Sequence, residues 1–268
     1  MKKNILLIII IIIFSVAIFL FLQKSGFFTE KNIIQEEFDE KENSLSFSII
    51  PINQTDSFYN IKAEYPQFKN ASNDFNKKIS DLINNKIDNF KKEAKDNWEA
   101  RKATAMPDDP VSDNPTEPFD FICTWKPVQN NSQYLSFVVN LYYFVGGAHG
   151  ANEIYAFNYD LDAQKEISIF EFLNSSQESF EKMSELAEKE VVLKLQSKEI
   201  IADDFIDKMI KNGTKAIPEN YKNFNFNRDS LIIYFQQYQV APGSAGEITI
   251  TFYKNNLEQN LIKSDYLK

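Results

Sequence analysis

His149 is the side chain of this sequence best suited to acid–base chemistry, because imidazole changes its charge near neutral pH. It lies in the run Gly146-Gly147-Ala148-His149-Gly150 and is the only histidine among 268 residues. A lone imidazole cannot build a typical metal site, and no cysteine lies near it in sequence to serve as a nucleophile. Three roles stay open: a hydrogen bond that fixes a chain bend, contact with a ligand, and catalysis. The glycine-rich setting favours the structural role, so we assign no catalytic residue and no metal ligand.

Other polar residues are weaker candidates for catalysis or ligand binding. Ser244 lies in Gly243-Ser244-Ala245-Gly246, where a nucleophile or an anion-binding turn is conceivable, but such a run between strands is typical of a plain turn. The pairs Asp108-Asp109 and Asp203-Asp204 are adjacent in sequence, so their side chains point in different directions and make poor acid–base couples. No phosphate loop, dinucleotide-binding motif or EF-hand loop is present, and we expect no cofactor.

The glycines must position whatever the chain binds. Five of the seven fall in two short segments, 146–150 and 243–246. Each segment separates aromatic and β-branched runs, a pattern typical of strands interrupted by a bend or bulge. Exposed tyrosines beside such breaks can stack on sugar rings. We therefore expect ligand contacts next to the two breaks, from Tyr143, His149, Asn152, Tyr238 and Ser244.

The N-terminus predicts a membrane anchor. Residues 5–22 contain no charged side chain, are long enough to cross the hydrocarbon core, and follow Lys2 and Lys3. A cleaved signal peptide is the alternative, but its apolar region is usually shorter and no small-residue cleavage site follows. We expect a single-pass protein of the cell membrane, with residues 23–44 as an acidic tether and the bulk of the chain extracytoplasmic.

The net charge restricts the possible partners, and the cysteine content excludes an intrachain disulfide. The net charge of −9 argues against nucleic acid and suits a basic partner. Cys123 is the only cysteine, so no intrachain disulfide can form, and its aromatic surroundings predict a small core residue.

Periodicity predicts an α+β fold, with an antiparallel sheet packed against amphipathic helices. The clearest helix has apolar residues recurring from Phe75 to Trp98, with Asn70 or Ser72 placed to cap its start. A second helix opens at Ser175 and a third covers about residues 203–212, with Phe205 expected to face inward. Long strands are expected at 119–128, 134–145, 153–161 and 231–240.

Several of these segments resemble a known family. They are Tyr143-Phe144-Val145-Gly146-Gly147-Ala148-His149-Gly150, then Asn158-Tyr159-Asp160-Leu161, Phe170-Glu171-Phe172-Leu173, and Tyr238-Gln239-Val240-Ala241-Pro242-Gly243-Ser244-Ala245-Gly246. Together they resemble the bacterial extracytoplasmic domain shared by RsiV-type anti-sigma factors and PdaC-type peptidoglycan deacetylases. The resemblance covers about residues 47–253. Where the family usually has Thr-Gly after Asp160-Leu161, this chain has Ala163-Gln164.

The resemblance implies four regions: a cytoplasmic stub and anchor at 1–22, the tether at 23–44, a DUF4163-like half at 45–130, and a DUF3298-like half at 131–268. An anti-sigma factor needs a cytoplasmic domain, and only four residues precede the anchor. A PdaC-like deacetylase needs several histidine ligands for its metal, and this chain has one. We therefore expect a membrane-anchored domain without catalytic activity that binds a cell-envelope ligand, either a cell-wall glycan or a basic wall-active protein such as lysozyme. The alternative is a cell-wall hydrolase or deacetylase that uses His149.

Overall fold

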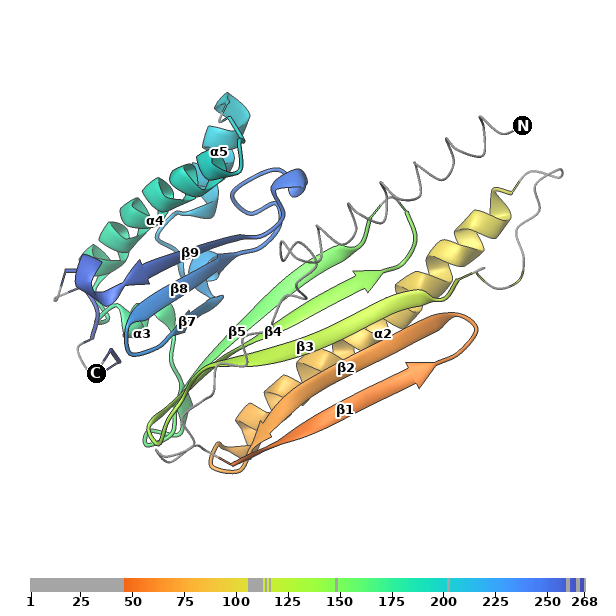
Figure 1. Ribbon diagram of the computed structural model, residues 1–268, viewed down its shortest axis with the longest axis horizontal. Coiled ribbons are helices and arrows are strands. Elements are labelled where there is room, and N and C mark those ends of the chain that lie inside the picture. Colours follow the sequence, from red (N-terminus) through yellow and green to blue (C-terminus); the bar gives the residue numbers. More distant parts are fainter. Residues whose placement is uncertain are drawn as a thin grey trace, which may run out of the picture. The chain divides into compact units, whose positions relative to one another are not determined.

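The computed structural model describes residues 46–105, 113, 115, 117–147, 149–201, 203–258, 261–263 and 266–267. They form two sheets, mainly antiparallel, with helices beside them (Figure 1), which confirms the predicted α+β class. The expected anchor at 5–22 and tether at 23–44 lie outside these residues. None of the described helices is long and apolar enough to cross a bilayer.

The larger sheet has six strands in the order β1 to β6. Their bounds are Phe47–Thr55, Tyr59–Phe68, Phe119–Asn130, Tyr134–Phe144, Ala151–Asp160 and Lys165–Glu166. Only β2 and β3 run parallel, because the long helix α2, Asn73–Ala103, lies between them in sequence and returns the chain to the same end. The expected division at residue 130 falls in the hairpin between β3 and β4, two neighbours in this sheet.

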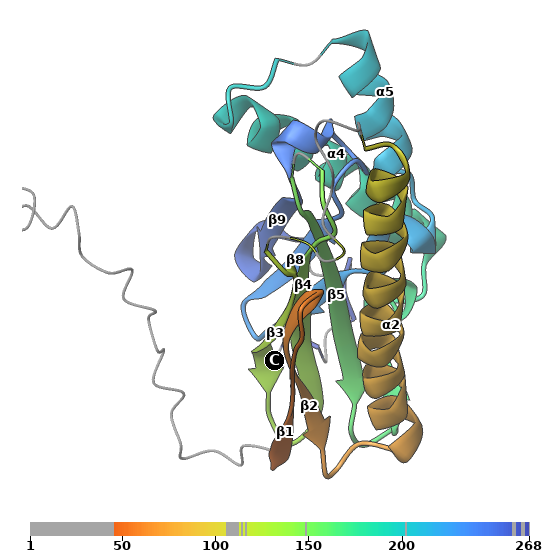
Figure 2. The ribbon, with the colours of Figure 1, turned by 90° about the vertical axis from the view of Figure 1, so that its right-hand side faces the viewer.

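Helix α2 covers one face of this sheet (Figure 2). The Ser72 hydroxyl accepts a hydrogen bond from the Phe75 N–H at 3.2 Å, so the predicted Ser72 cap is confirmed. Spacings of three and four residues place the apolar side chains on one stripe. The buried members of the stripe are Phe75, Ile79, Ile83, Ile87, Phe90, Ala94 and Trp98. Cys123 is buried in the facing strand, as expected, and burial raises the pKa of its thiol to about 12.

The smaller sheet contains β7 (Phe224–Phe226), β8 (Ser230–Phe235) and β9 (Ile248–Tyr253) in that order. The helices before it are α3 (Ile169–Phe172), α4 (Gln177–Ser197), α5 (Asp204–Gly213) and the 3-10 turn η1 (Pro218–Tyr221). Two further 3-10 turns are η2 (Gly243–Ala245) and η3 (Lys254–Asn256). One hydrophobic core joins the inner side of α4 to this sheet, including Phe180, Met183 and Phe235.

A buried polar seam joins the two sheets. Asn225 on β7 donates from its side-chain nitrogen to the Ser136 hydroxyl at 3.0 Å and to the Phe137 carbonyl at 3.0 Å. Asn158 on β5 donates to the Phe224 carbonyl at 2.6 Å. Ser136, Asn158 and Asn225 are each at most 4% exposed, so these buried hydrogen bonds fix the register between the sheets.

The two glycine segments behave as the sequence predicts. Gly146 and Gly147 have φ of +93° and +97°, a region open to glycine but unfavourable for other residues. Gly150 serves a different need, because a Cβ there would collide with the ring of Tyr142. A Cβ on Gly243 would collide with the Tyr238 ring in the same way.

Three local predictions are wrong. Helix α4 is capped by Ser176, one residue later than expected, since Ser175 takes a positive φ of 51°. Phe205 is 63% exposed, because Ile206 and Ile210 occupy the buried side of α5. Strand β8 ends at Phe235 and not at residue 240, because the chain turns there through Tyr238 at φ +69°.

The unusual turn after Leu161 keeps a left-handed backbone even without glycine. Gln164 has φ +54°, and its side-chain nitrogen donates to the Leu161 carbonyl at 2.7 Å and to the Asn70 carbonyl at 2.9 Å. These two bonds offset part of the backbone strain.

Candidate functional site: a groove beside strand β5

A groove of about 660 Å³ lies between α2, the edge of β5 and the turn that leads into β7. Its volume falls within the range of about 300–1,000 Å³ that small-molecule sites occupy. Most of its surface is apolar, with a few polar and charged groups among the lining residues. The lining residues are Lys78, Leu82, Tyr155, Ala156, Phe157, Asn158, Glu166, Ile167, Ser168, Ile169, Pro218, Lys222, Asn223 and Phe224.

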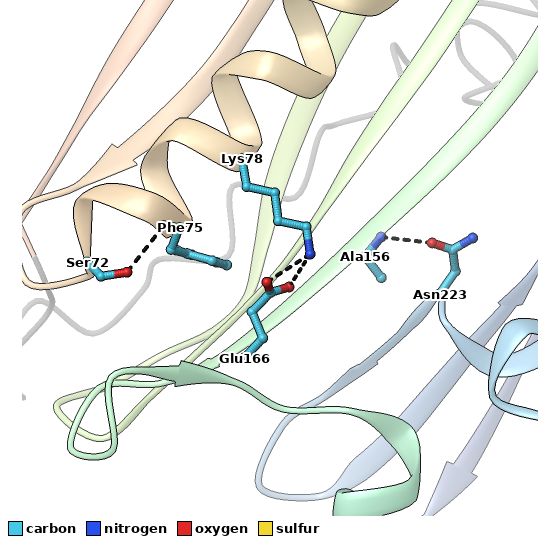
Figure 3. Close-up of polar contacts among 6 residues, drawn as sticks. All are labelled: Ser72, Phe75, Lys78, Ala156, Glu166 and Asn223. Carbon is cyan, nitrogen blue, oxygen red and sulfur yellow. Dashed lines mark hydrogen bonds and ion pairs between the residues drawn. The ribbon is translucent and has the colours of Figure 1, made fainter.

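Helix α2 supplies one wall. Lys78 and Leu82 are four residues apart and therefore share a face of the helix, next to the buried stripe. The Lys78 ammonium reaches both carboxylate oxygens of Glu166, at 2.6 and 2.8 Å. Figure 3 shows these two side chains pointing toward each other from α2 and β6. The pair ties the helix to the sheet edge and leaves little net charge at this part of the groove.

The edge of β5 supplies the floor, and side-chain amides from the C-terminal half hold it in place. The Asn223 side-chain oxygen accepts from the Ala156 N–H at 3.3 Å (Figure 3). Gln236 accepts from the Ile154 N–H at 3.1 Å and donates to the Ile154 carbonyl. These amides replace a neighbouring strand along this stretch of the edge, so the groove stays open where another strand would otherwise pair.

One lining residue, Tyr155, also belongs to a half-buried charged cluster. Its hydroxyl donates to Glu153, whose carboxylate also accepts from the Tyr143 hydroxyl at 3.0 Å. Lys86, two helical turns after Lys78, forms an ion pair of 2.5 Å with Glu153. The Lys86 ammonium lies 5.4 Å from the centre of the Tyr155 ring, a cation–π distance. The cluster fixes the orientation of the Tyr155 ring at the wall of the groove.

The cluster perturbs the titration of its members. Burial by itself would raise the pKa of Glu153, but the bonds from Lys86, Tyr155 and Tyr143 outweigh burial and lower this pKa. Burial opposes the charge of Lys86, yet its bonds to Glu153 and Tyr155 raise the Lys86 pKa. Burial and the Glu153 charge together raise the pKa of Tyr143 to about 12. Glu153 and Lys86 are therefore charged, and both tyrosines neutral, across the physiological pH range.

The five residues that the sequence predicts as ligand contacts lie apart from this groove. Tyr143 is half-buried and bonds Glu153 on the α2 side of the sheet. His149 is exposed, with Nδ1 3.1 Å from the Gly150 carbonyl oxygen, and Asn152 is exposed at the start of β5. Tyr238 and Ser244 are exposed in the loop between β8 and β9. Their contacts with a ligand stay predictions.

Sequence reasoning missed the groove residues. Tyr155, Glu166 and Asn223 come from three separate segments that only the folded chain brings together. One signal was present: Lys78, Leu82 and Lys86 recur every four residues beside the buried stripe, which marks a second helix face directed at the sheet edge.

The described residues do not fit a metal centre. Within the parts of the chain that the structure describes, no group of three or more His, Cys, Asp or Glu side chains is placed to hold a metal ion.

Comparison with known proteins finds two family models that match consecutive parts of the chain. A family model described as Deacetylase PdaC matches residues 52–152, and a model for a protein family of unknown function, DUF3298, matches residues 171–254. The chain thus carries a PdaC-type domain followed by a DUF3298 domain, which confirms the predicted resemblance. The expected DUF4163-like character of the first half is not among these matches.

Individual relatives agree with this class. The peptidoglycan-N-acetylmuramic acid deacetylase PdaC of Bacillus subtilis is 29% identical over 209 residues, which are 78% of this chain but 40% of that protein. This chain therefore spans about two fifths of the length of that relative. A DUF3298 family structure from Bacteroides fragilis superposes with a TM-score of 0.54 at 14% identity, over 80% of this chain and 93% of that one. Another from Pseudomonas aeruginosa gives 0.51 at 16% identity, over 84% and 97%. These structures show a shared fold.

The comparisons correct one expectation. We expected a chain without catalytic activity of its own. The matching deacetylase family model, and a relative named as a deacetylase, contradict this expectation, because both point toward an enzyme.

Proposed function

We propose that this chain is a cell-wall-directed domain that holds a short segment of peptidoglycan glycan in the groove beside β5. The groove is the observation that carries the proposal. Its apolar surface suits the C–H faces of sugar rings, and Lys78, Glu166, Ser168 and Lys222 bring hydrogen-bonding groups to the same space. The similarity to a peptidoglycan deacetylase supports peptidoglycan as the polymer.

Tyr155 is the residue we assign to sugar stacking. Its ring lines the groove, is half-buried, and is held at the hydroxyl by Glu153. A ring fixed in this way loses little side-chain freedom when a sugar packs on it, so more of the contact energy appears as affinity.

Calorimetric titration of the full chain with soluble, N-acetylated peptidoglycan fragments tests this proposal. We expect Tyr155→Leu to weaken binding about tenfold, because one aromatic contact contributes about 0.5–1.5 kcal/mol beyond its area. Tyr155→Phe keeps the ring and should bind nearly as well as the unchanged chain. Tyr253→Leu removes a tyrosine that is 60% exposed on β9 and serves as the matched control. Absence of binding by the unchanged chain would refute the proposal.

A second candidate, deacetylation of the same polymer, is favoured by the match of residues 52–152 to the deacetylase family model. Acetate release from N-acetylated peptidoglycan fragments by the full chain, with and without added Zn²⁺, measures it. If His149 takes part, His149→Ala abolishes release and leaves the melting temperature unchanged. If His149 only braces its loop, the same change lowers the melting temperature and acetate release survives.

We also propose that residues 5–22 anchor the chain in the cell membrane with the remainder outside the cytoplasm. Protease added to intact cells should then digest the C-terminal part of the chain, whereas a cytoplasmic protein would survive. The acidic net charge also supports a basic wall-active protein such as lysozyme as a partner, and titration with lysozyme in low and high salt tests that prediction.

A further inference from the structure

The groove has a local charge opposite to that of the whole chain. Its lining contains three charged side chains, Lys78, Glu166 and Lys222. Lys78 and Glu166 form an ion pair, so each largely neutralises the other. Lys222 forms no ion pair with any carboxylate among the described residues. One positive charge therefore remains in a groove that belongs to a chain with a net charge of −9.

The position of Lys222 is determined by the fold. It directly follows η1, whose Tyr221 is fully buried and donates from its hydroxyl to the Thr214 carbonyl at 2.5 Å. The next residue, Asn223, is 5% exposed and bonds the edge of β5. Lys222 thus lies between two anchored neighbours, and its own side chain is exposed at the groove. An anchored backbone places the start of this side chain while the ammonium stays accessible to a ligand.

We propose that the groove selects an acidic saccharide over a neutral one, and that Lys222 is the residue that recognises the carboxylate. This inference rests on the proposed function. The ligand class is a glycan in which a sugar itself carries a carboxylate, with the sugar ring against Tyr155 and the acid directed to Lys222. The charge of Lys222 distinguishes the two saccharides, because the Lys78–Glu166 pair can hydrogen-bond the hydroxyl and amide groups that both saccharides carry.

Two tetrasaccharides of equal length test the inference by titration of the full chain. One contains only N-acetylglucosamine; the other alternates N-acetylglucosamine with N-acetylmuramic acid and has no peptide. We expect the acidic tetrasaccharide to bind about two- to fivefold more tightly at low salt, the range of a partly exposed ion pair. The preference should shrink in high salt, because mobile ions screen an exposed charge.

Two lysine variants test which group recognises the carboxylate. Lys222→Met keeps much of the side-chain length and removes the charge, so we expect the preference to disappear, with a larger loss of affinity for the acidic tetrasaccharide than for the neutral one. Lys208→Met removes an exposed lysine on α5 outside the groove and should keep the preference. Free stem peptide, added as a competitor, should not displace the acidic tetrasaccharide from the unchanged chain.

The outcomes separate the inference from the function on which it rests. Equal binding of both saccharides, or a preference that survives in Lys222→Met, overturns the role of Lys222 and leaves the groove as a glycan site. Displacement by stem peptide overturns the assignment of the carboxylate to the sugar. Failure of the unchanged chain to bind either saccharide removes both proposals.

Discussion

Strands β4 and β5 present two different faces, and the two faces are stabilised in different ways. On the face toward α2, Phe137 and Phe157 stack with ring centres 5.0 Å apart, and both are at most 5% exposed. On the opposite face, Ser136 and Asn158 bond to each other at 2.7 Å and to Asn225 of the smaller sheet. Alternation along a strand places these neighbours on opposite sides.

The two faces show that contacts which stabilise a fold strongly need not be the contacts that specify one arrangement of its parts. Burial of apolar surface is non-directional and stabilises in proportion to buried area, so several side chains of suitable size can provide it. Buried amides stabilise only when each donor meets an acceptor, so they fix one register between the sheets. The seam also positions Asn223, two residues before Asn225, at the groove. The site therefore depends more on the polar face than on the aromatic one.

The largest effect is expected from breaking the aromatic face. Phe137→Ala should lower the free energy of unfolding by about 3–5 kcal/mol, since it leaves a cavity in a packed core. Chemical denaturation measures it. Phe205→Ala removes the same side chain from a site that is 63% exposed and should cost less than about 0.5 kcal/mol. Similar losses for the two variants would contradict the location of the core.

Disrupting the polar face should lower the free energy of unfolding by somewhat less, and the loss should depend on whether polar atoms are replaced by apolar ones. Asn225→Leu keeps the volume and removes the donor, leaving Ser136 Oγ and the Phe137 carbonyl without it. We expect a loss of about 2–3 kcal/mol, the cost of unsatisfied buried polar groups. Phe137→Met, also of similar size, should cost less than about 1.5 kcal/mol. The distinction between the faces fails if Asn225→Leu is the better tolerated of the two.

The cluster around Glu153 should add a pH-dependent term. In the folded state the pKa of the Glu153 carboxyl is lowered from 4.5. The stabilisation that its charge contributes is therefore present above pH 4.5 and is lost as the pH falls through the folded-state pKa. Glu153→Gln should lower stability by about 1–2 kcal/mol near pH 7, which is about 4 °C in melting temperature. Melting curves from pH 7 to 3 should show this gap closing. A gap that stays constant with pH would show that the carboxylate charge is not responsible.

The smallest effect on stability should come from the pair at the groove wall. Lys78 and Glu166 have side chains 56% and 44% exposed, so solvent screens their attraction. Lys78→Met should change the free energy of unfolding by less than about 0.5 kcal/mol, measured by denaturation. Glycan affinity should fall more clearly than stability does. Lys77→Met, which removes the partner of Asp81 and lies outside the groove lining, is the control and should leave binding unchanged.

Much of the fold was predictable because local patterns carry it. The stripe from Phe75 to Trp98 encodes the face of α2 that must be buried, and the glycines at 146, 147 and 246 encode backbone angles. Phe205 shows the limit of such patterns. The adjacent apolar residues Phe205 and Ile206 in a short helix do not reveal which of the two will be buried, because the answer depends on where α4 lies.

The candidate site was less predictable, since its residues are distant in sequence. The sequence pattern predicts an ordinary strand residue at Tyr155 and an ordinary polar turn at Lys222 and Asn223. Sequence reasoning placed the ligand contacts at the glycine breaks, where unusual composition attracts attention. The groove lies elsewhere, at an edge of β5 that is visible only when the neighbours of that strand are known.

The sequence alone determined the α+β class, the long helix with its Ser72 cap, the buried Cys123 and the resemblance to the PdaC and DUF3298 domains, because short-range periodicity and local backbone requirements are enough for each. The tertiary structure decided which charges pair, which amides replace a missing strand, and that Lys222 in the groove forms no ion pair with a described carboxylate. These features depend on contacts between segments up to about ninety residues apart, such as Lys78 with Glu166 and Asn225 with Ser136, which no local pattern encodes.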